Sequence, residues 1–259
     1  MKTQLVIDHI VQWLATCLDT TGLNGFVIGV SGGIDSAVTS TLCARTGKPV
    51  IVLNMPIHQA QSQVSLACAH IEWLKTNYKT VNDAHVELTP VFDQIKHSLP
   101  GSIQDGLTMA NTRARLRMLT LYAFASSHKM LVAGTGNKVE DFGVGFFTKY
   151  GDGGVDISPI ADLMKTQVYE LAKVLGILRQ IQTAAPTDGL WEDERTDENQ
   201  IGARYAELEW AMDYLDSDAT DPLNARQKEV LSIYKTFHLT NQHKMEPIPV
   251  CQIPKTLLD

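Results

Sequence analysis

Short, continuous apolar runs are the feature that most constrains the fold of this chain. Phe26–Val30 and Val50–Leu53 are partly β-branched and carry no polar residue, and Met130–Ala133 has the same character. Runs of this length without polar alternation are typical of strands covered on both faces, as in a parallel sheet. Val86–Leu88 is a weaker run and is predicted as a further strand of the same sheet.

Stretches with helical periodicity separate these runs. Apolar residues recur at helix spacing over residues 3–20, 34–46, 61–77 and 111–127. Strands that alternate with helices form βαβ units, whose right-handed crossovers bring the carboxyl ends of the strands to one edge. The sequence therefore predicts an α/β fold: a doubly wound, Rossmann-like parallel sheet with helices on both faces. Its ligand site is expected at that edge.

The last part of the chain differs from the rest in composition. Residues 142–157 are rich in glycine with interleaved aromatic and charged residues, which predicts an ordered loop against a ligand or a mobile lid. Three further helices are predicted: Thr166–Leu175, Asp197–Leu215, and Pro222 to about His238. No linker or repeat interrupts the chain. We therefore expect one domain over residues 1–259, with a helical C-terminal part at about 197–240.

Composition excludes several classes of protein. The chain has 22 Lys and Arg against 29 Asp and Glu, a formal charge of −7, and a general nucleic-acid coat would need a clustered cationic surface. No apolar stretch reaches the roughly 18 residues that would suggest a membrane-spanning helix. The start, Met1–Leu5, lacks the basic and apolar regions of a signal peptide, so a cytoplasmic location is expected.

A glycine-rich motif follows the first predicted strand. It reads Gly29-Val30-Ser31-Gly32-Gly33-Ile34-Asp35-Ser36. Glycines there let backbone N–H groups approach a ligand, and the helix N-terminus adds partial positive charge, so the motif is predicted to bind phosphate. It is not a Walker P-loop, which carries a Lys where this chain has Ile34 and Asp35. Because Asp35 would repel phosphate, it predicts a Mg²⁺ ion between the two.

The Ser-Gly-Gly-x-Asp-Ser motif resembles the pyrophosphate loop of the ATP pyrophosphatases, whose fold is adenine nucleotide alpha hydrolase-like. Further segments, in the same order along the chain, are similar to the NAD synthetase family. The segments that carry this resemblance are Asn111–Met118, Gly134–Glu140, Gly145–Asp156, Pro159–Gln167, Pro186-Thr187, Leu190-Trp191, Thr196–Glu198 and His243-Lys244.

The resemblance implies a ligase that forms a carbon–nitrogen bond in the last step of NAD biosynthesis. ATP and ammonia would convert deamido-NAD (nicotinate adenine dinucleotide) to NAD, AMP and pyrophosphate. A carboxylate is a poor electrophile, so amide formation needs activation, here as an acyl-adenylate that ammonia attacks. Positioning and charge stabilisation suffice for this chemistry, which agrees with the lack of a Ser-His-Asp or Cys-His constellation in the sequence.

The resemblance also implies roles for single residues. Asp35 and Glu140 are expected to bind Mg²⁺, and Asp35 and Lys165 to act in catalysis. The expected ATP-binding residues are Gly29, Val30, Ser31, Gly32, Gly33, Ile34, Asp35, Ser36, Thr135, Lys165 and Thr187. The expected substrate-binding residues are Arg115, Lys149, Asp156, His243 and Lys244. Side chains two apart on a helix lie on different faces, so Arg113 and Arg117 are expected to be surface or inter-subunit charges.

Other functions stay open at this point. Amidation of nicotinate mononucleotide would use the same core, whereas a tRNA-adenylating ATP pyrophosphatase agrees less well with the acidic charge. A regulator without catalysis is disfavoured by the joint presence of Asp35, Glu140, Lys149 and Lys165. The first strand begins near residue 26, so no N-terminal amidase domain is expected. The nitrogen donor is then free ammonia, or ammonia from a separate glutaminase, and the family implies a homodimer.

Overall fold

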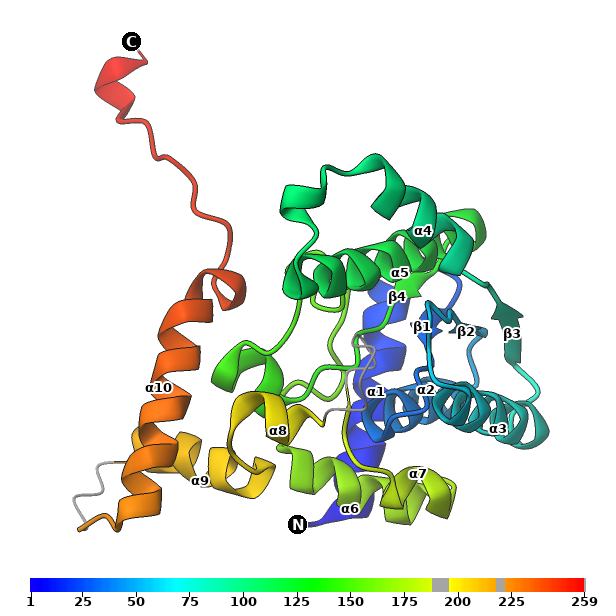
Figure 1. The fold of residues 1–259 in the computed structure, drawn as a ribbon. Coiled ribbons are helices and arrows are strands. Elements are labelled where there is room, and N and C mark those ends of the chain that lie inside the picture. Colours follow the sequence, from blue (N-terminus) through cyan, green and yellow to red (C-terminus); the bar gives the residue numbers. More distant parts are fainter. Residues whose placement is uncertain (188–195, 218–221, 259) are drawn as a thin grey trace.

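The centre of the molecule is a parallel sheet. The computed structural model describes residues 1–187, 196–217 and 222–258. Within these residues the strands are β1 (Phe26–Gly29), β2 (Val50–Asn54), β3 (Val81–His85) and β4 (Leu131–Val132). Their order in the sheet is β3-β2-β1-β4. Helices cover both faces of the sheet (Figure 1), which confirms the predicted doubly wound α/β fold.

Alternate residues of the strands point to opposite faces of the sheet. Phe26 and Ile28 of β1 pair in register with Val50 and Val52 of β2, and all four pack into one apolar core. Val27, between them, packs into the core on the other face. All five side chains are inaccessible to solvent. Burial on both faces explains why these strands appear in the sequence as continuous apolar runs.

Two helical layers enclose the sheet. The core on one face is shared with α1 (Thr3–Thr21), α2 (Ile34–Arg45), α3 (Gln61–Asn77), α6 (Lys165–Leu175) and α7 (Arg179–Thr183). The core on the other face is shared with α4 (Thr89–Ser98) and α5 (Gly106–His128). Two short 3₁₀ segments are η1 (Gly101–Ile103) and η3 (Lys255–Leu257). In the described part of the chain, no helix is long and apolar enough to cross a membrane.

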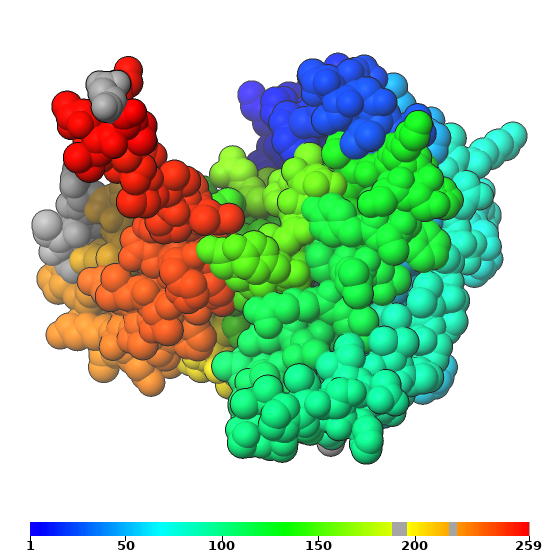
Figure 2. Space-filling model, turned by 90° about the horizontal axis from the view of Figure 1, so that it is seen from above, coloured from blue at the N-terminus to red at the C-terminus, as the bar shows by residue number. Residues whose placement is uncertain are grey.

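The C-terminal part has an apolar cluster of its own. The cluster joins η2, a π-helix over Val139–Val144, to α8 (Asp197–Ile201), α9 (Tyr205–Asp216) and α10 (Ala225–Met245). Beyond α10 the tail leaves the body of the molecule, and Figure 2 shows its end apart from the N-terminal half. Ile248 and Val250 of this tail are exposed.

One strand lies earlier than predicted. The prediction of a strand at Val86–Leu88 is wrong, because β3 occupies Val81–His85. This strand is at the edge of the sheet, and Asn82 and Asp83 on it are exposed. An edge strand needs little apolar sequence, so β3 has no apolar run, and the short run Val86–Leu88 beyond it is not a strand.

The predicted helix over Asp197–Leu215 is two helices. Gly202, with φ +86°, ends α8 in the left-handed conformation, and α9 begins at Tyr205. The periodic pattern continues across this break because residues of both helices pack into the same apolar cluster. Periodicity alone therefore did not reveal the break.

The last helix is shifted from its predicted position of Pro222 to about His238. It runs over Ala225–Met245, so it begins later and ends later. Its start is set by Asn224, whose side chain accepts a hydrogen bond from the backbone N–H three residues on, at 2.9 Å. Asn is among the best N-cap residues, and here it outweighs the preference of Pro for the first helical position.

The strand order creates a switch point between β1 and β4. From β1 the chain builds β2 and β3 on one side, whereas β4 lies on the other side. At such a point, the loops that leave the carboxyl ends of the two strands separate and leave a crevice. The two loops here are the glycine-rich motif after β1 and residues 134–137 after β4. The fold therefore directs the two motifs to one place.

We expect Glu207 to stabilise the junction of α9 and α10. Its carboxylate accepts hydrogen bonds from Arg226 Nε at 2.9 Å and Nη2 at 2.8 Å, and this lowers the pKa of Glu207 from 4.5 to about 2. A lowered carboxyl pKa stabilises the fold fully above pH 4.5, and the stabilisation is lost as pH falls toward 2.

Glu207→Met should therefore lower the free energy of unfolding by about 1–2 kcal/mol at neutral pH. Urea unfolding of both proteins at several pH values measures the difference, which should shrink as the pH falls below 4.5. A difference that is constant down to the acid limit would contradict this account.

Candidate active site

Glycine at position 32 lets the loop after β1 lie directly against α3. Gly32 has φ +91°, a left-handed conformation that side chains disfavour. A Cβ atom there would lie 2.8 Å from the carbonyl oxygen of Gln63, closer than such atoms can approach. The loop therefore needs glycine for both its backbone conformation and its packing.

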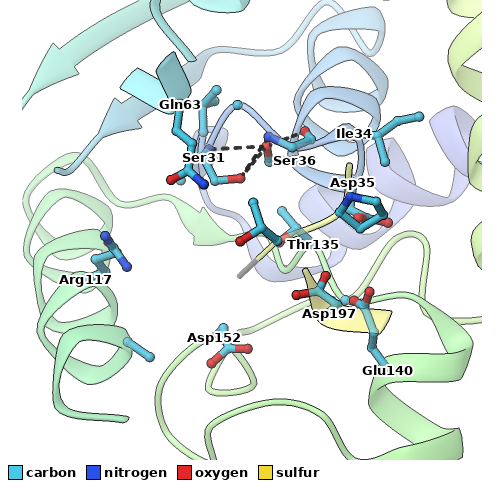
Figure 3. A pocket seen from close by; sticks show the side chains of 18 of the residues that line it. Ser31, Ile34, Asp35, Ser36, Gln63, Arg117, Thr135, Glu140, Asp152 and Asp197 are labelled. Atoms are coloured by element: carbon cyan, nitrogen blue, oxygen red, sulfur yellow. Dashed lines mark hydrogen bonds between the residues drawn. The ribbon is translucent and has the colours of Figure 1, made fainter. Parts of the chain in front are cut away.

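Two serine hydroxyls shape the loop at the start of α2. Ser36 Oγ accepts a hydrogen bond from Ser31 N–H at 3.3 Å and donates one to the Gly33 carbonyl at 2.9 Å. Ser31 Oγ lies 3.2 Å from Ser36 Oγ and accepts from Gly33 N–H at 3.2 Å (Figure 3). The first N–H groups of a helix have no partner within the helix. The loop thus places two hydroxyls beside the N-terminus of α2, an arrangement suited to an anion.

A buried lysine joins two carboxylates beside this loop. Lys165 Nζ donates to Asp35 Oδ2 at 2.5 Å and to Glu140 Oε1 at 3.0 Å. The Lys165 side chain is 4% exposed, and those of Asp35 and Glu140 are 16% and 15% exposed. Asp35 lies in the first turn of α2, Glu140 in η2 beyond β4, and Lys165 at the start of α6. We call these three residues the charged triad.

Burial and charge oppose each other in the charged triad. Burial by itself would lower the pKa of Lys165, but the two carboxylates raise it above its ordinary value. Burial would raise the pKa of Glu140, yet the Lys165 ammonium holds it below its usual range. For Asp35 burial is the larger effect and raises the pKa against the pull of Lys165. Lys165 therefore stays charged, and the site holds an ordered cation.

Asn137 connects the two carboxylates through the loop after β4. Its Nδ2 donates to Asp35 Oδ1 at 3.3 Å, and its Oδ1 accepts from the Glu140 backbone N–H at 3.2 Å. The side chain is fully buried. Asn137 belongs to a segment that carried the family resemblance, but sequence reasoning gave it no role.

Tyr205 of α9 contacts two members of the charged triad, Glu140 and Lys165. Its hydroxyl donates to Glu140 Oε1 at 2.5 Å and lies 3.1 Å from Asp197 Oδ2. Lys165 Nζ lies 4.6 Å from the centre of its ring. Burial, and then the charge of Glu140, raises the pKa of Tyr205, so the hydroxyl remains a donor. Sequence reasoning missed this residue because an aromatic side chain at the start of a helix looks like a core residue.

A cavity of about 490 Å³ opens in front of the charged triad. This is the size of small-molecule sites in general. Figure 3 shows Asp35 and Glu140 on one side of the cavity and Arg117 on another. All eleven residues predicted to bind ATP line the cavity: Gly29, Val30, Ser31, Gly32, Gly33, Ile34, Asp35, Ser36, Thr135, Lys165 and Thr187. Leu190 and Trp191, which also carried the resemblance, lie outside the described residues.

Carboxyl groups outnumber cationic side chains in the described lining of this cavity. Asp141, Asp152 and Asp197 line it together with Asp35 and Glu140. Burial, and then the charge of Glu140, raises the pKa of Asp141 to about 8. An anionic ligand that enters beside these carboxylates needs positive charge in addition to Lys165 and the helix N-terminus.

The carboxylates fit a metal ion that arrives with a ligand. No group of three His, Cys, Asp or Glu side chains in the described residues is arranged to hold a metal. Asp35 and Glu140, however, both contact one ammonium group, so their carboxylates already converge on one cation. Two carboxylates plus phosphate oxygens are a common donor set for Mg²⁺. These two residues therefore suit a Mg²⁺ ion bound together with a nucleotide.

Four of the residues predicted to bind substrate form one cluster outside the cavity lining. Arg115 Nε donates to the Lys149 carbonyl at 3.2 Å, and Lys149 Nζ donates to the His243 carbonyl at 2.6 Å. Lys244 Nζ donates to the carbonyls of Gly145 and Phe147. We call Arg115, Lys149, His243 and Lys244 the cationic cluster. It joins α5, the glycine-rich segment and the end of α10.

Asp156 lies apart from the cationic cluster. Its Oδ2 accepts a hydrogen bond from Val132 N–H at 2.8 Å, and its Oδ1 accepts from the Tyr122 hydroxyl at 2.9 Å. The residue therefore caps the end of β4. Its exposed position leaves it accessible to a ligand as well.

Arg113 and Arg117 are not the free surface charges that the sequence predicts, since one is buried and the other lines the cavity. Arg113 is 8% exposed, and its guanidinium lies 4.6 Å from the centre of the Phe92 ring. Arg117 lines the cavity, where Nε donates to the Met55 carbonyl at 3.0 Å and Nη2 to Gln59 Oε1 at 3.2 Å. Arg113 is covered by α4, and Arg117 contacts the segment that follows β2.

Fold and site together define a class of protein. A crevice at the switch point of a parallel sheet is where α/β proteins bind their ligands, and the fold is consistent with the adenine nucleotide alpha hydrolase-like class. The NAD synthase family matches residues 6–248, and the chain belongs to that family. It is thus a ligase that forms a carbon–nitrogen bond.

Known proteins agree with this assignment over nearly the whole chain. The NH(3)-dependent NAD(+) synthetase of Mannheimia succiniciproducens is 35% identical over 251 residues, which cover 94% of each chain. The structure of NMN synthetase from Francisella tularensis is 33% identical with a TM-score of 0.86, covering 98% of this chain and 100% of that one. NH3-dependent NAD synthetase from Campylobacter jejuni has the same fold, with a TM-score of 0.79 at 24% identity, and covers 97% and 100%.

Gly32→Ala should damage the site more than an alanine at another left-handed glycine. Gly22 has φ +66° but nothing within 4 Å of its Cβ position, so it is a matched control. Gly22→Ala should cost about 1 kcal/mol of stability, whereas Gly32→Ala adds a clash and should cost about 2–3 kcal/mol.

Thermal unfolding with and without ATP and Mg²⁺ measures both effects. The stabilisation by ATP should be lost in Gly32→Ala and retained in Gly22→Ala. Equal behaviour of the two variants would contradict the role of the loop.

Proposed function

We propose that this chain amidates the carboxylate of deamido-NAD, using ammonia as nitrogen donor and ATP with Mg²⁺ for activation. The products are NAD, AMP and pyrophosphate. The observation that carries the proposal is the charged triad directly beside the glycine-rich loop: an ordered cation and two carboxylates at the entrance to an anion site. Family membership, and relatives named as NH(3)-dependent NAD(+) synthetases, support the choice of reaction.

Activation and amidation are two balanced steps. In the first, an oxygen of the substrate carboxylate bonds to the α-phosphorus of ATP while the bond to pyrophosphate breaks, which gives an acyl-adenylate. In the second, ammonia nitrogen bonds to the carbonyl carbon, the bond to AMP breaks and one proton is released. The charge that grows on the phosphate in the first step needs a cation already in place. Lys165 supplies that cation.

One end of the cavity is suited to the phosphates of ATP and the other end to its adenine ring. The loop N–H groups and the hydroxyls of Ser31 and Ser36 would bind the departing pyrophosphate. Asp35 and Glu140 would hold Mg²⁺, which neutralises phosphate charge when bound. At the other end, Leu53, Met118 and Leu121 line the cavity near Arg117. An apolar wall beside a planar guanidinium suits the adenine ring.

The cationic cluster is suited to the substrate's own phosphates. Arg115, Lys149 and Lys244 bring three positive charges together outside the ATP cavity, on segments far apart in sequence. Asp156, at the end of β4, would bind a polar group of the substrate nearer the sheet. We extend the proposal to a homodimer, because Leu107 and Leu119 on α5 are 61% and 68% exposed.

Nicotinate mononucleotide is the second candidate substrate. The specific observation in its favour is the likeness to the NMN synthetase of Francisella tularensis, at a TM-score of 0.86. The reacting carboxylate and the activation step are the same for both substrates, so the charged triad does not distinguish them. A competition experiment does, with both substrates in one reaction and kcat/KM taken from the ratio of products. We expect deamido-NAD to be preferred, and a preference for the mononucleotide would replace the first substrate with the second.

Ammonium salt should serve as nitrogen donor, added directly or released by a separate glutaminase. With ATP, Mg²⁺ and deamido-NAD, the purified chain should form NAD, AMP and pyrophosphate in equal amounts. Glutamine in place of ammonium should give no NAD. NAD formation with glutamine but not with ammonium would overturn the assigned donor, and absence of pyrophosphate release at every ammonia concentration would overturn the reaction.

Lys165→Met should reveal the metal site. Without the ammonium group, kcat should fall by about 100-fold or more. Asp35 and Glu140 then lack a partner, so MgCl₂ without ATP should raise the unfolding temperature of the variant more than that of the wild type. Adding Glu140→Gln to Lys165→Met should remove this gain. If MgCl₂ does not stabilise Lys165→Met, Asp35 and Glu140 are not the metal ligands.

A further inference from the structure

The start of α6, which carries Lys165, is held by a side chain of another helix. Glu209 of α9 accepts a hydrogen bond from the Thr166 backbone N–H at Oε1, 2.8 Å away, and from the Thr166 hydroxyl at Oε2, 2.7 Å away. Thr166 directly follows Lys165 in the first turn of α6. Met164, which precedes the helix, has no side-chain oxygen with which to cap it. Glu209 therefore takes the place of a local N-cap residue.

The same face of α9 contacts the end of the Lys165 side chain. Tyr205 and Glu209 are four residues apart on α9 and so lie one turn apart on one face. The ring of Tyr205 is 4.6 Å from Lys165 Nζ, and its hydroxyl donates to Glu140. One helix thus fixes both the backbone at the base of Lys165 and the ammonium group at its tip.

The helix that provides these contacts is itself anchored. The Tyr205 N–H donates to Glu198 Oε1 at 2.9 Å. The ion pair of Glu207 with Arg226 lies on another face of α9 and is not part of this support. Leu208 and Ala211 of α9 are fully buried in the C-terminal cluster. The face of α9 toward α6 can therefore act as a rigid support.

We propose that Glu209 and Tyr205 are positioning residues, through which the C-terminal helices set the place of the Lys165 ammonium between Asp35 and Glu140. Lysine has a flexible four-carbon side chain, and a shift of about 1 Å in a group that acts on the transition state can cost up to 100-fold in rate. The inference rests on the proposed function, in which Lys165 stabilises charge on the reacting phosphate.

Glu209→Met tests the inference, with Glu207→Met as matched control two residues away on the same helix. Glu209→Met removes both acceptors for Thr166 and should lower kcat by about 10-fold or more while KM for ATP stays within about twofold. Glu207→Met should lower the unfolding temperature and leave kcat unchanged. Glu209→Gln keeps an oxygen for the Thr166 N–H and a donor for its hydroxyl, so it should restore most of kcat.

Tyr205→Phe keeps the ring beside Lys165 and removes only the hydroxyl. It should lower kcat by less than Glu209→Met, and the double variant should lose less than the product of the two single losses, because both act through one group. Equal losses of kcat in Glu209→Met and Glu207→Met, or a rise in KM with kcat unchanged, would show a merely structural role and overturn the inference.

A second measurement does not depend on turnover. Lys165 is 3% exposed, so acetic anhydride should acetylate it slowly in the wild type, as followed by mass spectrometry of peptides. Glu209→Met should raise its acetylation several-fold, and Glu207→Met should not. If the wild type lacks the proposed activity but Lys165 is still acetylated faster in Glu209→Met than in Glu207→Met, the proposed function is wrong and the positioning role stands. Unchanged acetylation in Glu209→Met would overturn the positioning role.

Discussion

One ammonium group holds together three distant parts of this chain. Lys165 Nζ contacts Asp35, which follows β1, and Glu140, which lies beyond β4. An unpaired charge at such a depth would cost several kcal/mol, so each member requires the others in place. The switch point between β1 and β4 is what makes this possible, because it delivers both carboxylates to one crevice where α6 can supply the cation.

Stability alone does not explain the charged triad. Apolar residues of similar volume would avoid the cost of removing three charges from water. The arrangement instead suits ligand binding. The Lys165 ammonium is held in one position, faces the cavity and lies beside the N-terminus of α2. Asn137 and Tyr205 complete the hydrogen bonding of Glu140 and so keep the network from being partly unsatisfied. The charged triad is thus connected directly to the core of the C-terminal helices.

The parts of the molecule that could be predicted from sequence are those whose signal is local. β1 and β2 are buried on both faces and appear as apolar runs, and the loop between β1 and α2 needs glycine at fixed positions. β3 is an edge strand with polar residues and left no such signal. Contacts between segments far apart, such as Glu209 with Thr166, follow no periodicity. Arg113 and Arg117 are a further example. Their spacing shows that they lie on different faces of α5, but it does not show which segments cover those faces.

The order of the site residues along the chain has a consequence for synthesis. The strands β1 to β4 and both carboxylates, Asp35 and Glu140, precede Lys165. A nascent chain that has emerged only as far as η2 can pair its sheet, but it holds two neighbouring carboxylates without their countercharge. Two carboxylates placed together without a cation repel each other, so their close approach depends on Lys165 of α6. The charged triad can therefore form only after the chain through α6 has been made, later in synthesis than every strand of the sheet.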